Sequence, residues 1–359
     1  MPWNRELTDR LLREIEAQTS VPMTLMEVCG SHTMAIARSG IRSLLPEKLS
    51  LLSGPGCPVC VTGAEEIDKI LELAMEPGLT IASYGDMLRV PGSVPGDSLQ
   101  RRRALGAKVE VVYSAMDALE LAAAEPEREV LFLAVGFETT APGTAAAVLE
   151  ARERGIRNFS IYSMLKSVEP ALRSLIAQEG FKVQGFICPG HVASIIGERG
   201  FRFIQEDYGL PGAIAGFEPG EILLAIRSLT GQLARGEARL ENCYKRAVRP
   251  EGNPLARAVL DRCFQLRRDS WRGLGEIENS GFKLREEFVQ FDGEKRFPVE
   301  PKARAKKSSP CRCGDVICGR IRPEDCPMFG GRCTPEDPLG PCMVSSEGAC
   351  AAAYKYRGL

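Results

Sequence analysis

Residues 130–140 read Val-Leu-Phe-Leu-Ala-Val-Gly-Phe-Glu-Thr-Thr: an unbroken apolar run, then a glycine, then polar side chains. A short run of this kind predicts a β-strand that is buried on both faces. Strands buried on both faces are typical of parallel sheets covered by helices. The stretch therefore indicates an α/β fold.

Similar apolar runs recur along the first 220 residues with helical stretches between them. They fall into two series, which predict two similar parallel-sheet α/β domains, over 18–118 and 119–250. The rest of the chain, 251–359 with 1–17, is expected to hold a helical segment, a linker and a small cysteine-rich C-terminal domain. The eight runs end at Cys29, Ser53, Tyr84, Tyr113, Val135, Met164, Cys188 and Gly216.

Polar motifs follow most of these predicted strands, where open α/β sheets keep their sites. They are CGSH (29–32), GPGCPVC (54–60), GDMLRVPG (85–92), GFETTAPG (136–143) and CPGH (188–191). CGSH echoes CPGH, and GFETT echoes GFEPG at 216–220, which favours two similar halves.

Composition excludes several classes of function. Among 359 residues, 46 Lys and Arg balance 47 Asp and Glu, so no overall charge favours nucleic acid or an anionic membrane. The first residues lack the apolar core of a secretory signal, and no apolar stretch of about 18 residues occurs. We expect a cytoplasmic protein, with neither nucleic acid nor membrane as partner.

The later part of the chain changes character. From about Glu221 the pattern predicts helices, one of them reaching Trp271, and the basic, proline-bearing stretch 295–310 is interpreted as a linker.

Seven of the thirteen cysteines lie within the last fifty residues, among Gly, Pro, Asp and Arg. Cytoplasmic thiols are held reduced, so such a tail favours a metal over disulfides. Cys313, Cys326, Cys333 and Cys350 suffice for a 4Fe-4S cluster, but zinc and disulfides stay open on spacing alone. Cys311, Cys318 and Cys342 remain candidate ligands.

Two further cysteine groups lie at predicted strand ends. Cys57 and Cys60 precede a helix whose start is marked by a Thr62–Glu65 capping box. We favour a reversible dithiol-disulfide pair. Half of a zinc site and two inert thiols are the alternatives. Cys29 and His32 are a candidate nucleophile with its base, or two ligands of a soft metal; a packed thiol and imidazole is the plain alternative.

Five polar residues at the same sheet edge have a plainer interpretation. Glu138, Thr139 and Thr140 follow the VGF run, and Asp86 and Arg89 follow ASYG. Capping and loop bracing are their expected roles.

In combination, MEVCGSHT, SGPGCPVCV, SYGDMLRVPGS, VGFETTAPG, CPGHVA, AGFEPGEIL, RPEGNP and the tail CTPEDPLGPCMVSSEGACAAAYKY resemble the HypD family of hydrogenase maturation factors over essentially the whole chain. The resemblance implies two α/β domains and a third, cluster-bearing domain. It also implies a scaffold with redox activity, rather than a conventional turnover enzyme, on which the Fe(CN)2CO group of nickel-iron hydrogenases is assembled.

By motif, the resemblance makes Cys29 the iron-binding thiolate with His32 beside it, Cys57 and Cys60 the redox-active pair, and the set Cys313, Cys326, Cys333 and Cys350 the ligands of the 4Fe-4S cluster. The implied partners are a HypC-type chaperone and, transiently, HypE, which HypF supplies. A cluster-dependent thiol-disulfide oxidoreductase acting on a protein substrate is the alternative function.

Overall fold

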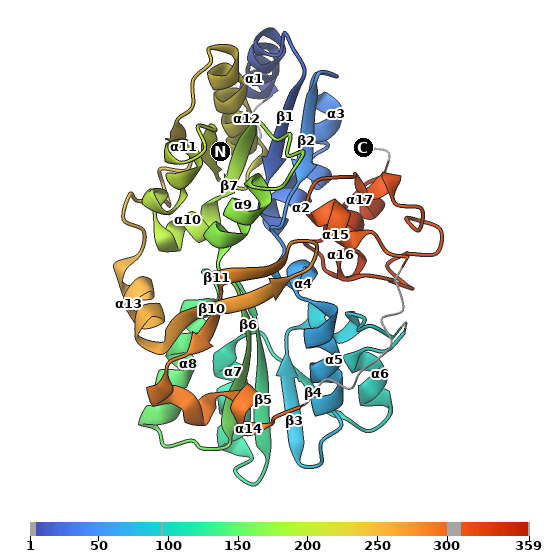
Figure 1. Cartoon of the computed structure of the whole chain (residues 1–359), viewed down its shortest axis with the longest axis vertical. Helices are drawn as coiled ribbons and strands as arrows, with labels where there is room; N and C mark the ends of the chain where they lie inside the picture. The colour runs from blue at the N-terminus through green and yellow to red at the C-terminus, as the bar shows by residue number, and fades with distance from the viewer. Residues whose placement is uncertain (1–4, 95, 300–309, 358–359) are drawn as a thin grey trace.

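The computed structural model describes residues 5–94, 96–299 and 310–357, and within them the chain forms two parallel sheets (Figure 1). The first sheet has the order β2-β1-β7-β8-β9, and all neighbouring strands run parallel. Its strands are β1 (Met23–Glu27), β2 (Leu49–Ser53), β7 (Gly185–Pro189), β8 (Gly212–Ala215) and β9 (Leu240–Asn242).

The second sheet has the order β4-β3-β5-β6 and is also parallel throughout. Its central strand β5 is buried at every position after Glu129, as expected for a strand covered on both faces. The α/β fold class with two parallel-sheet domains is thus confirmed. The strands are β3 (Leu79–Ser83), β4 (Lys108–Val111), β5 (Glu129–Gly136) and β6 (Phe159–Leu165).

The division into 18–118 and 119–250 does not follow these sheets, because each sheet takes strands from both ranges. The chain starts the first sheet with β1 and β2, builds the whole second sheet, and then returns to place β7 beside β1. The echoing motifs CGSH and CPGH consequently end two neighbouring strands of one sheet, rather than corresponding strands of two halves. Apolar runs identify strands but carry no information about their partners.

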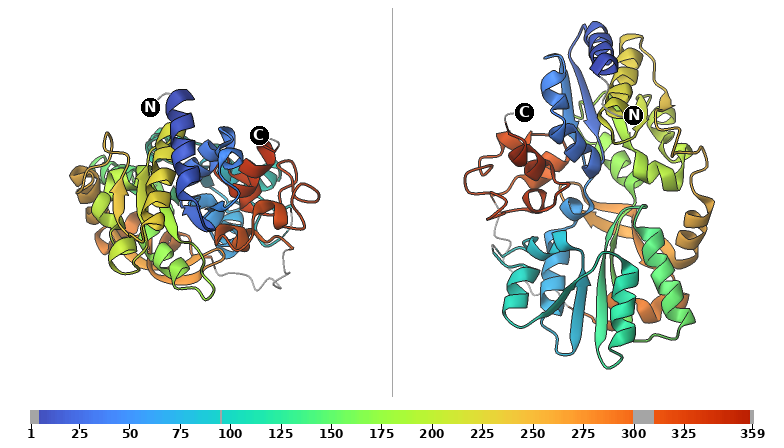
Figure 2. Two further views of the ribbon diagram at one scale, coloured as in Figure 1. Left: turned by 90° about the horizontal axis from the view of Figure 1, so that it is seen from above. Right: turned by 180° about the vertical axis from the view of Figure 1, so that it is seen from behind.

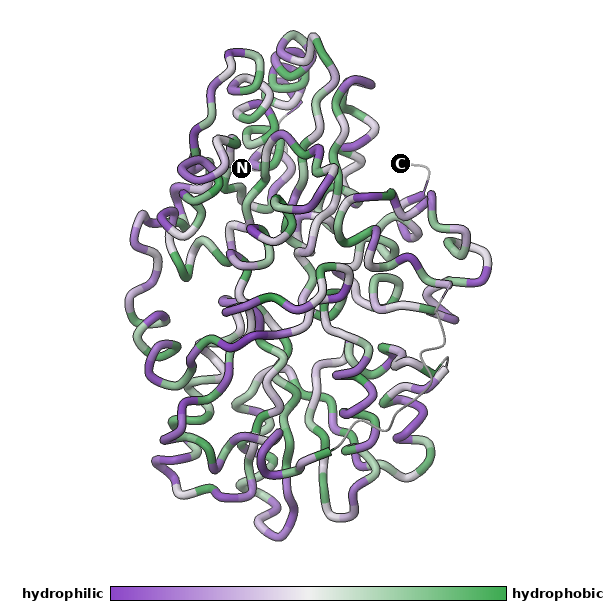
Figure 3. Tube along the Cα trace, viewed as in Figure 1, coloured by the Kyte–Doolittle hydropathy of each residue, from purple (hydrophilic) through white to green (hydrophobic). Residues whose placement is uncertain are grey.

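Helices alternate with the strands and bury apolar faces against them. On the first sheet, α1 packs against α12 through Leu11, Ile15 and Ile226, and α12 contacts β7 and β8. In Figure 3 the strands are mostly green, that is hydrophobic, whereas many peripheral loops are purple. These helices are α1 (Arg5–Gln18), α2 (Gly30–Arg38), α3 (Ile41–Leu44), α9 (Val168–Ile176), α10 (Gly190–Ile196), α11 (Phe203–Glu206) and α12 (Pro219–Ala234).

The second sheet is covered in the same way. Helices α7 and α8 pack on β5 and β6, where Leu119 and Val148 are fully buried. Within the described residues no helix is both long and apolar enough to cross a bilayer. The helices between its strands, and the short α4 that leads into them, are α4 (Pro58–Val61), α5 (Ala64–Leu73), η1 (Gly85–Arg89), α6 (Leu99–Ala104), α7 (Ala115–Ala124) and α8 (Ala141–Glu153).

The helix predicted to reach Trp271 ends earlier than expected. Helix α13 (Pro254–Cys263) stops at Cys263, and the next residues form an antiparallel hairpin of β10 (Phe264–Trp271) and β11 (Gly275–Leu284). Along β10 buried or half-buried side chains alternate with exposed ones, which is the period of a strand. The hairpin contacts β6 and α9 and lies between the two sheets (Figure 1).

The C-terminal segment lies beside α2 and α4, as the views from above and behind also show (Figure 2). It is a compact cysteine-rich unit of short helices. The predicted linker, 295–310, falls largely outside the described residues. The helices after the hairpin are η3 (Glu286–Phe291), α14 (Gly293–Arg296), α15 (Cys313–Ile317), η4 (Pro323–Asp325), α16 (Pro341–Val344) and α17 (Ala349–Lys355); η2 (Glu198–Phe201) precedes α11.

Candidate functional site

A cavity of about 170 Å³ lies where the carboxyl ends of strands from both sheets meet the C-terminal segment. This is the edge at which parallel α/β sheets keep their sites. Its chemistry-bearing lining residues follow β1, β2, β5 and β7, with one from the tail: Cys29, Ser31, Pro58, Thr139, Thr140, His191 and Glu347.

Cys29 lies at the turn between β1 and α2, and its side chain is buried. Burial raises the pKa of its thiol to about 12, although the backbone N–H groups of His32 and Ser31 favour the thiolate. The side chain is therefore a neutral thiol at neutral pH. A bound metal cation would displace this proton and bind the thiolate.

Glu27 fixes the position of Cys29. It is a fully buried carboxylate at the end of β1 that accepts the Cys29 N–H at 3.0 Å and the Thr33 hydroxyl. Burial raises its pKa to about 7. Glu27 was not predicted from the sequence, although a charged side chain at the end of the apolar run MTLME was a usable signal.

The imidazole of His32 does not line the cavity. It is fully buried, its Nε2 donates to the carbonyl of Gly216 at 2.9 Å, and its ring stacks on Phe217. Burial lowers its pKa to about 4, so the ring is neutral. The other histidine, His191, also stacks on Phe217 and does line the cavity. The role assigned to the His32 ring stays a prediction.

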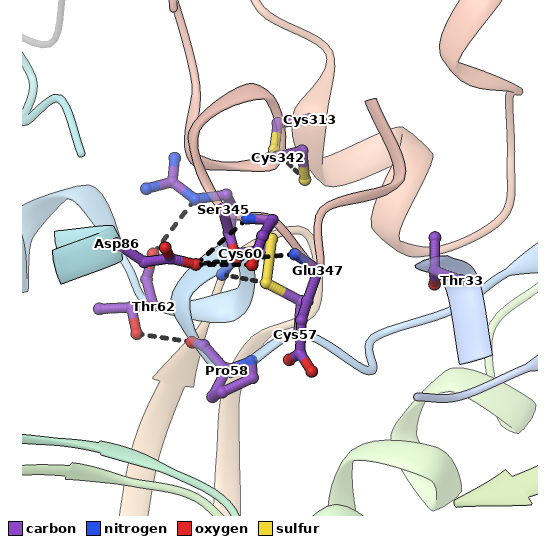
Figure 4. The surroundings of a disulfide bond; sticks show 12 residues. Thr33, Cys57, Pro58, Cys60, Thr62, Asp86, Cys313, Cys342, Ser345 and Glu347 are labelled. Atoms are coloured by element: carbon purple, nitrogen blue, oxygen red, sulfur yellow. Dashed lines mark hydrogen bonds between the residues drawn. A yellow bond between two sulfur atoms is a disulfide. The ribbon is translucent and has the colours of Figure 1, made fainter. Parts of the chain in front are cut away.

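Cys57 and Cys60 form a disulfide across α4, and both are buried (Figure 4). Cys57 is the N-cap of α4, and its sulfur accepts the N–H of Cys60 at 3.1 Å. The loop that leads to it touches the Cys29 loop directly, because Gly30 N–H donates to Gly56 O at 2.8 Å. The loop that leads to the disulfide and the loop that holds Cys29 are thus in direct backbone contact.

The predicted Thr62–Glu65 capping box is absent. Thr62 is the C-cap of α4 and its hydroxyl donates back to the Pro58 carbonyl at 2.9 Å, while α5 begins after Gly63 without a side-chain cap. The prediction of a capping box was wrong because a separate four-residue helix, α4, precedes α5. The Thr62 hydroxyl bonds to the backbone of α4 and is not available to cap α5.

A second, smaller cavity lies within the C-terminal segment, beside the disulfide. Figure 4 shows two of its cysteines, Cys313 and Cys342, next to Cys57 and Cys60, and helices α15 and α16 contact α4. The four predicted ligands line it, together with two further cysteines. The six are Cys311, Cys313, Cys326, Cys333, Cys342 and Cys350.

Two of these sulfurs are in direct contact, because Cys313 Sγ and Cys342 Sγ are 2.7 Å apart. Hydrogen bonds from the Cys311 and Cys342 thiols hold the pKa of Cys313 well below its usual range. Cys318 lies outside the cavity, with its sulfur 3.3 Å from the carbonyl of Gly273. Among the described residues no three Cys, His, Asp or Glu side chains are already arranged around a metal position. Nevertheless, converging soft thiols are the donor set that an iron–sulfur cluster requires.

Glu347 is a site residue that the sequence did not reveal. It accepts the Ser31 hydroxyl at 2.7 Å and packs on Gly30, so the tail brings a half-buried carboxylate to the Cys29 loop. Burial raises its pKa. Its one sequence signal was its place in SSEGAC, between two cavity cysteines.

The bracing roles expected of the sheet-edge charges are confirmed. Asp86 accepts the Ser345 hydroxyl at 3.0 Å and the Ser346 N–H at 3.1 Å, so it holds the loop that presents Glu347. Arg89 donates to the carbonyl of Pro335 at 2.8 Å. Glu138 accepts the Val168 N–H at the start of α9.

Comparison with known proteins identifies the family of the chain. The family model described as "HypD: Hydrogenase formation hypA family" matches residues 6–357. The hydrogenase maturation factor HypD of Azotobacter vinelandii is 43% identical over 358 residues, covering 98% of this chain and 93% of the relative. The factor of the same name from Escherichia coli K12 is 42% identical over 337 residues, covering 94% of this chain and 90% of the relative. The chain therefore belongs to the HypD family of hydrogenase maturation factors.

Proposed function

We propose that this chain is the scaffold on which the Fe(CN)2CO group of nickel-iron hydrogenases is assembled. Cys29 holds the iron substrate, and Cys57 and Cys60 deliver electrons that arrive from a 4Fe-4S cluster. As a hydrogenase maturation factor, the protein works with other maturation proteins in the cytoplasm.

One observation carries the proposal: the Cys57–Cys60 disulfide lies between the Cys29 cavity and the six-cysteine cavity. On one side, the Gly56 loop touches the Cys29 loop through the Gly30–Gly56 hydrogen bond. On the other side, α4 contacts the helices that carry Cys313 and Cys342. A two-electron couple thus has neighbours on both sides with which it can exchange electrons.

Cys29 suits an iron that carries cyanide and carbon monoxide. A soft thiolate matches low-spin iron with π-acceptor ligands. The cavity adds Thr139 and Thr140 from β5, and Glu347 from the tail, as polar groups around the substrate. Enclosure between two domains would protect a reactive intermediate from solvent.

Cys313, Cys326, Cys333 and Cys350 would hold the 4Fe-4S cluster, which supplies electrons one at a time when bound. Cys57 and Cys60 take up two such electrons and two protons as the S–S bond breaks, and become two thiols. An external one-electron donor replenishes the cluster after each transfer.

We propose the partners from the resemblance to the HypD family. Cys29 supplies one thiolate, and we propose that a HypC-type chaperone supplies another to complete the iron site. HypE, loaded by HypF, would deliver cyanide transiently to the same cavity.

The alternative, a thiol-disulfide oxidoreductase that acts on another protein, needs sulfurs that a substrate disulfide can reach. Cys57 is only 5% exposed and Cys60 2% exposed. This burial favours internal electron transfer over attack on an external disulfide.

Infrared spectroscopy of the anaerobically purified chaperone complex tests the proposal. Cys29→Ala should abolish the bands of iron-bound cyanide and carbon monoxide but leave the visible absorbance of the cluster. Cys243→Ala is the matched control, since Cys243 is a half-buried free cysteine that directly follows β9, the edge strand of the first sheet, and does not line the Cys29 cavity. Bands that persist in Cys29→Ala would refute the iron assignment.

A further inference from the structure

Arg272 lies at the turn of the β10–β11 hairpin and is bonded to the end of the disulfide helix. Its backbone N–H donates to Val61 O at 2.8 Å, and its Nε donates to Thr62 O at 3.1 Å. The preceding residue, Trp271, is fully buried and pairs with Thr62 in an isolated bridge. The turn is therefore fastened to α4, which carries Cys57 and Cys60.

The same turn also touches the cysteine-rich segment. Gly273 has a φ of +84°, and a Cβ at this position would lie 2.8 Å from the Cα of Gly314, the residue after Cys313. Its carbonyl oxygen is 3.3 Å from the sulfur of Cys318. Arg272 is thus placed where the disulfide helix, the hairpin and the Cys313 helix meet.

The guanidinium of Arg272 is incompletely paired. Its Nη2 is buried and finds no hydrogen-bond partner among the described residues. A buried charged donor without a partner is costly, so the fold should supply an acceptor. Because Gly273 packs on Gly314, the residue after Cys313, this turn holds the positive charge of Arg272 beside the segment that carries Cys313.

We propose that Arg272 is a positioning residue that raises the reduction potential of the cluster bound at Cys313. The inference rests on the proposed function. A cluster with thiolate ligands carries net negative charge, which becomes more negative on reduction. A fixed positive charge nearby stabilises the reduced state more than the oxidised state, and an acceptor sulfur would satisfy the unpaired Nη2.

Redox titration of the anaerobically purified full chain, followed by electron paramagnetic resonance, tests this. Arg272→Met removes the charge and keeps much of the side-chain volume; at a fixed potential it should lower the ratio of reduced to oxidised cluster on the order of tenfold, or about 59 mV for one electron. Arg272→Lys keeps the charge and should stay close to the wild type. The matched control is Arg320→Met, since Arg320 also donates to Gly273 O but is 45% exposed and paired with Asp315. Solvent screens such a charge, so its removal should leave the potential unchanged.

Each outcome decides the assignment. A cluster with the wild-type potential in Arg272→Met overturns it, and so does an equal shift in the Met and Lys variants, because a mere brace of α4 would not depend on charge. If Arg272→Met cannot hold a cluster, retention in Arg272→Lys supports the charge role, whereas loss from both shows that Arg272 is structural. A wild-type protein without acid-labile sulfide would instead contradict the proposed function, and with it the role of Arg272.

Discussion

The backbone of Gly56 packs directly against the backbone of Cys29, so closely that a Cβ on Gly56 would collide with the Cys29 nitrogen and Cα. Backbone atoms cannot move aside as a flexible side chain can. The disulfide loop and the Cys29 loop therefore hold each other in place.

Gly56→Ala should consequently displace the Cys29 loop and destabilise the protein by about 1 to 3 kcal/mol. The chaperone complex of this variant should lose most of its cyanide and carbonyl infrared bands. Gly143→Ala is the control, because Gly143 lies exposed in α8 with open space at its Cβ position; its stability should stay within about 1 kcal/mol of the wild type. An intact infrared spectrum in Gly56→Ala would show that the close approach is dispensable.

Asp86→Ala should loosen the loop that carries Glu347. The Asp86 carboxylate accepts hydrogen bonds from Ser345 and Ser346, and hydrogen bonds to a charged group contribute about 1.5 to 3 kcal/mol. Hydrogen exchange of the amides in 342–350 should accelerate by tenfold or more. In Asp207→Ala, which loses only an exposed ion pair with Arg173, exchange in this segment should not change.

Alanine substitutions across the tail should separate cluster ligands from bystanders. On the predicted ligand set, Cys313→Ala, Cys326→Ala, Cys333→Ala and Cys350→Ala each lower iron and acid-labile sulfide, whereas Cys311→Ala and Cys342→Ala keep four irons per chain. Cys318→Ala is the control outside the cavity and should also keep them. Loss of iron from Cys342→Ala, with retention in one of the four, would replace that ligand by Cys342. Zinc without sulfide would discard the cluster.

The contribution of His32 to the free energy of unfolding should fall as the pH drops from about 6.5 to 4. Burial lowers the pKa of this imidazole to about 4 in the folded state, so the unfolded chain binds the proton first. The group contributes its stability above pH 6.5 and loses at most about 3 kcal/mol as the pH falls towards 4.

Chemical denaturation across this pH range checks the prediction with His32→Gln, in which this part of the pH dependence should disappear. His191→Gln is the control and should change the slope less, because His191 is exposed. An unchanged slope in His32→Gln would mean that His32 is not held neutral in the fold.

The sequence predicted the strands well because strands buried on both faces must be apolar throughout. All eight predicted runs became β1 to β8, and residues that follow β1, β2, β5 and β7 line the candidate site. The pairing of β1 with β7 could not be predicted, since an apolar run such as MTLME does not specify which strand lies next to it in the sheet. The hairpin was missed because FQLRRDSW follows a helix without a turn signal, although its alternation has the period of a strand.

The site was predictable where one short motif holds the chemistry and unpredictable where distant segments meet. Cys29, Cys57 and Cys60 each follow a predicted strand, so their convergence at one edge could be expected. Glu347 and Arg272 reach the site only because the tail and the hairpin fold back on α2 and α4. Contacts between such remote segments depend on the tertiary fold and leave no local pattern.

The return of the chain from the second sheet to β7 has a consequence for biosynthesis. Strand β1 must wait for a partner that is synthesised some 160 residues later, since its Leu25 pairs with Gly185. At about 5 to 20 residues per second, the ribosome leaves this edge of β1 open for roughly ten to thirty seconds. The nascent protein therefore completes its second, later-starting sheet first, and closes the cavity beside Cys29 only near the end of translation, when Glu347 has been made.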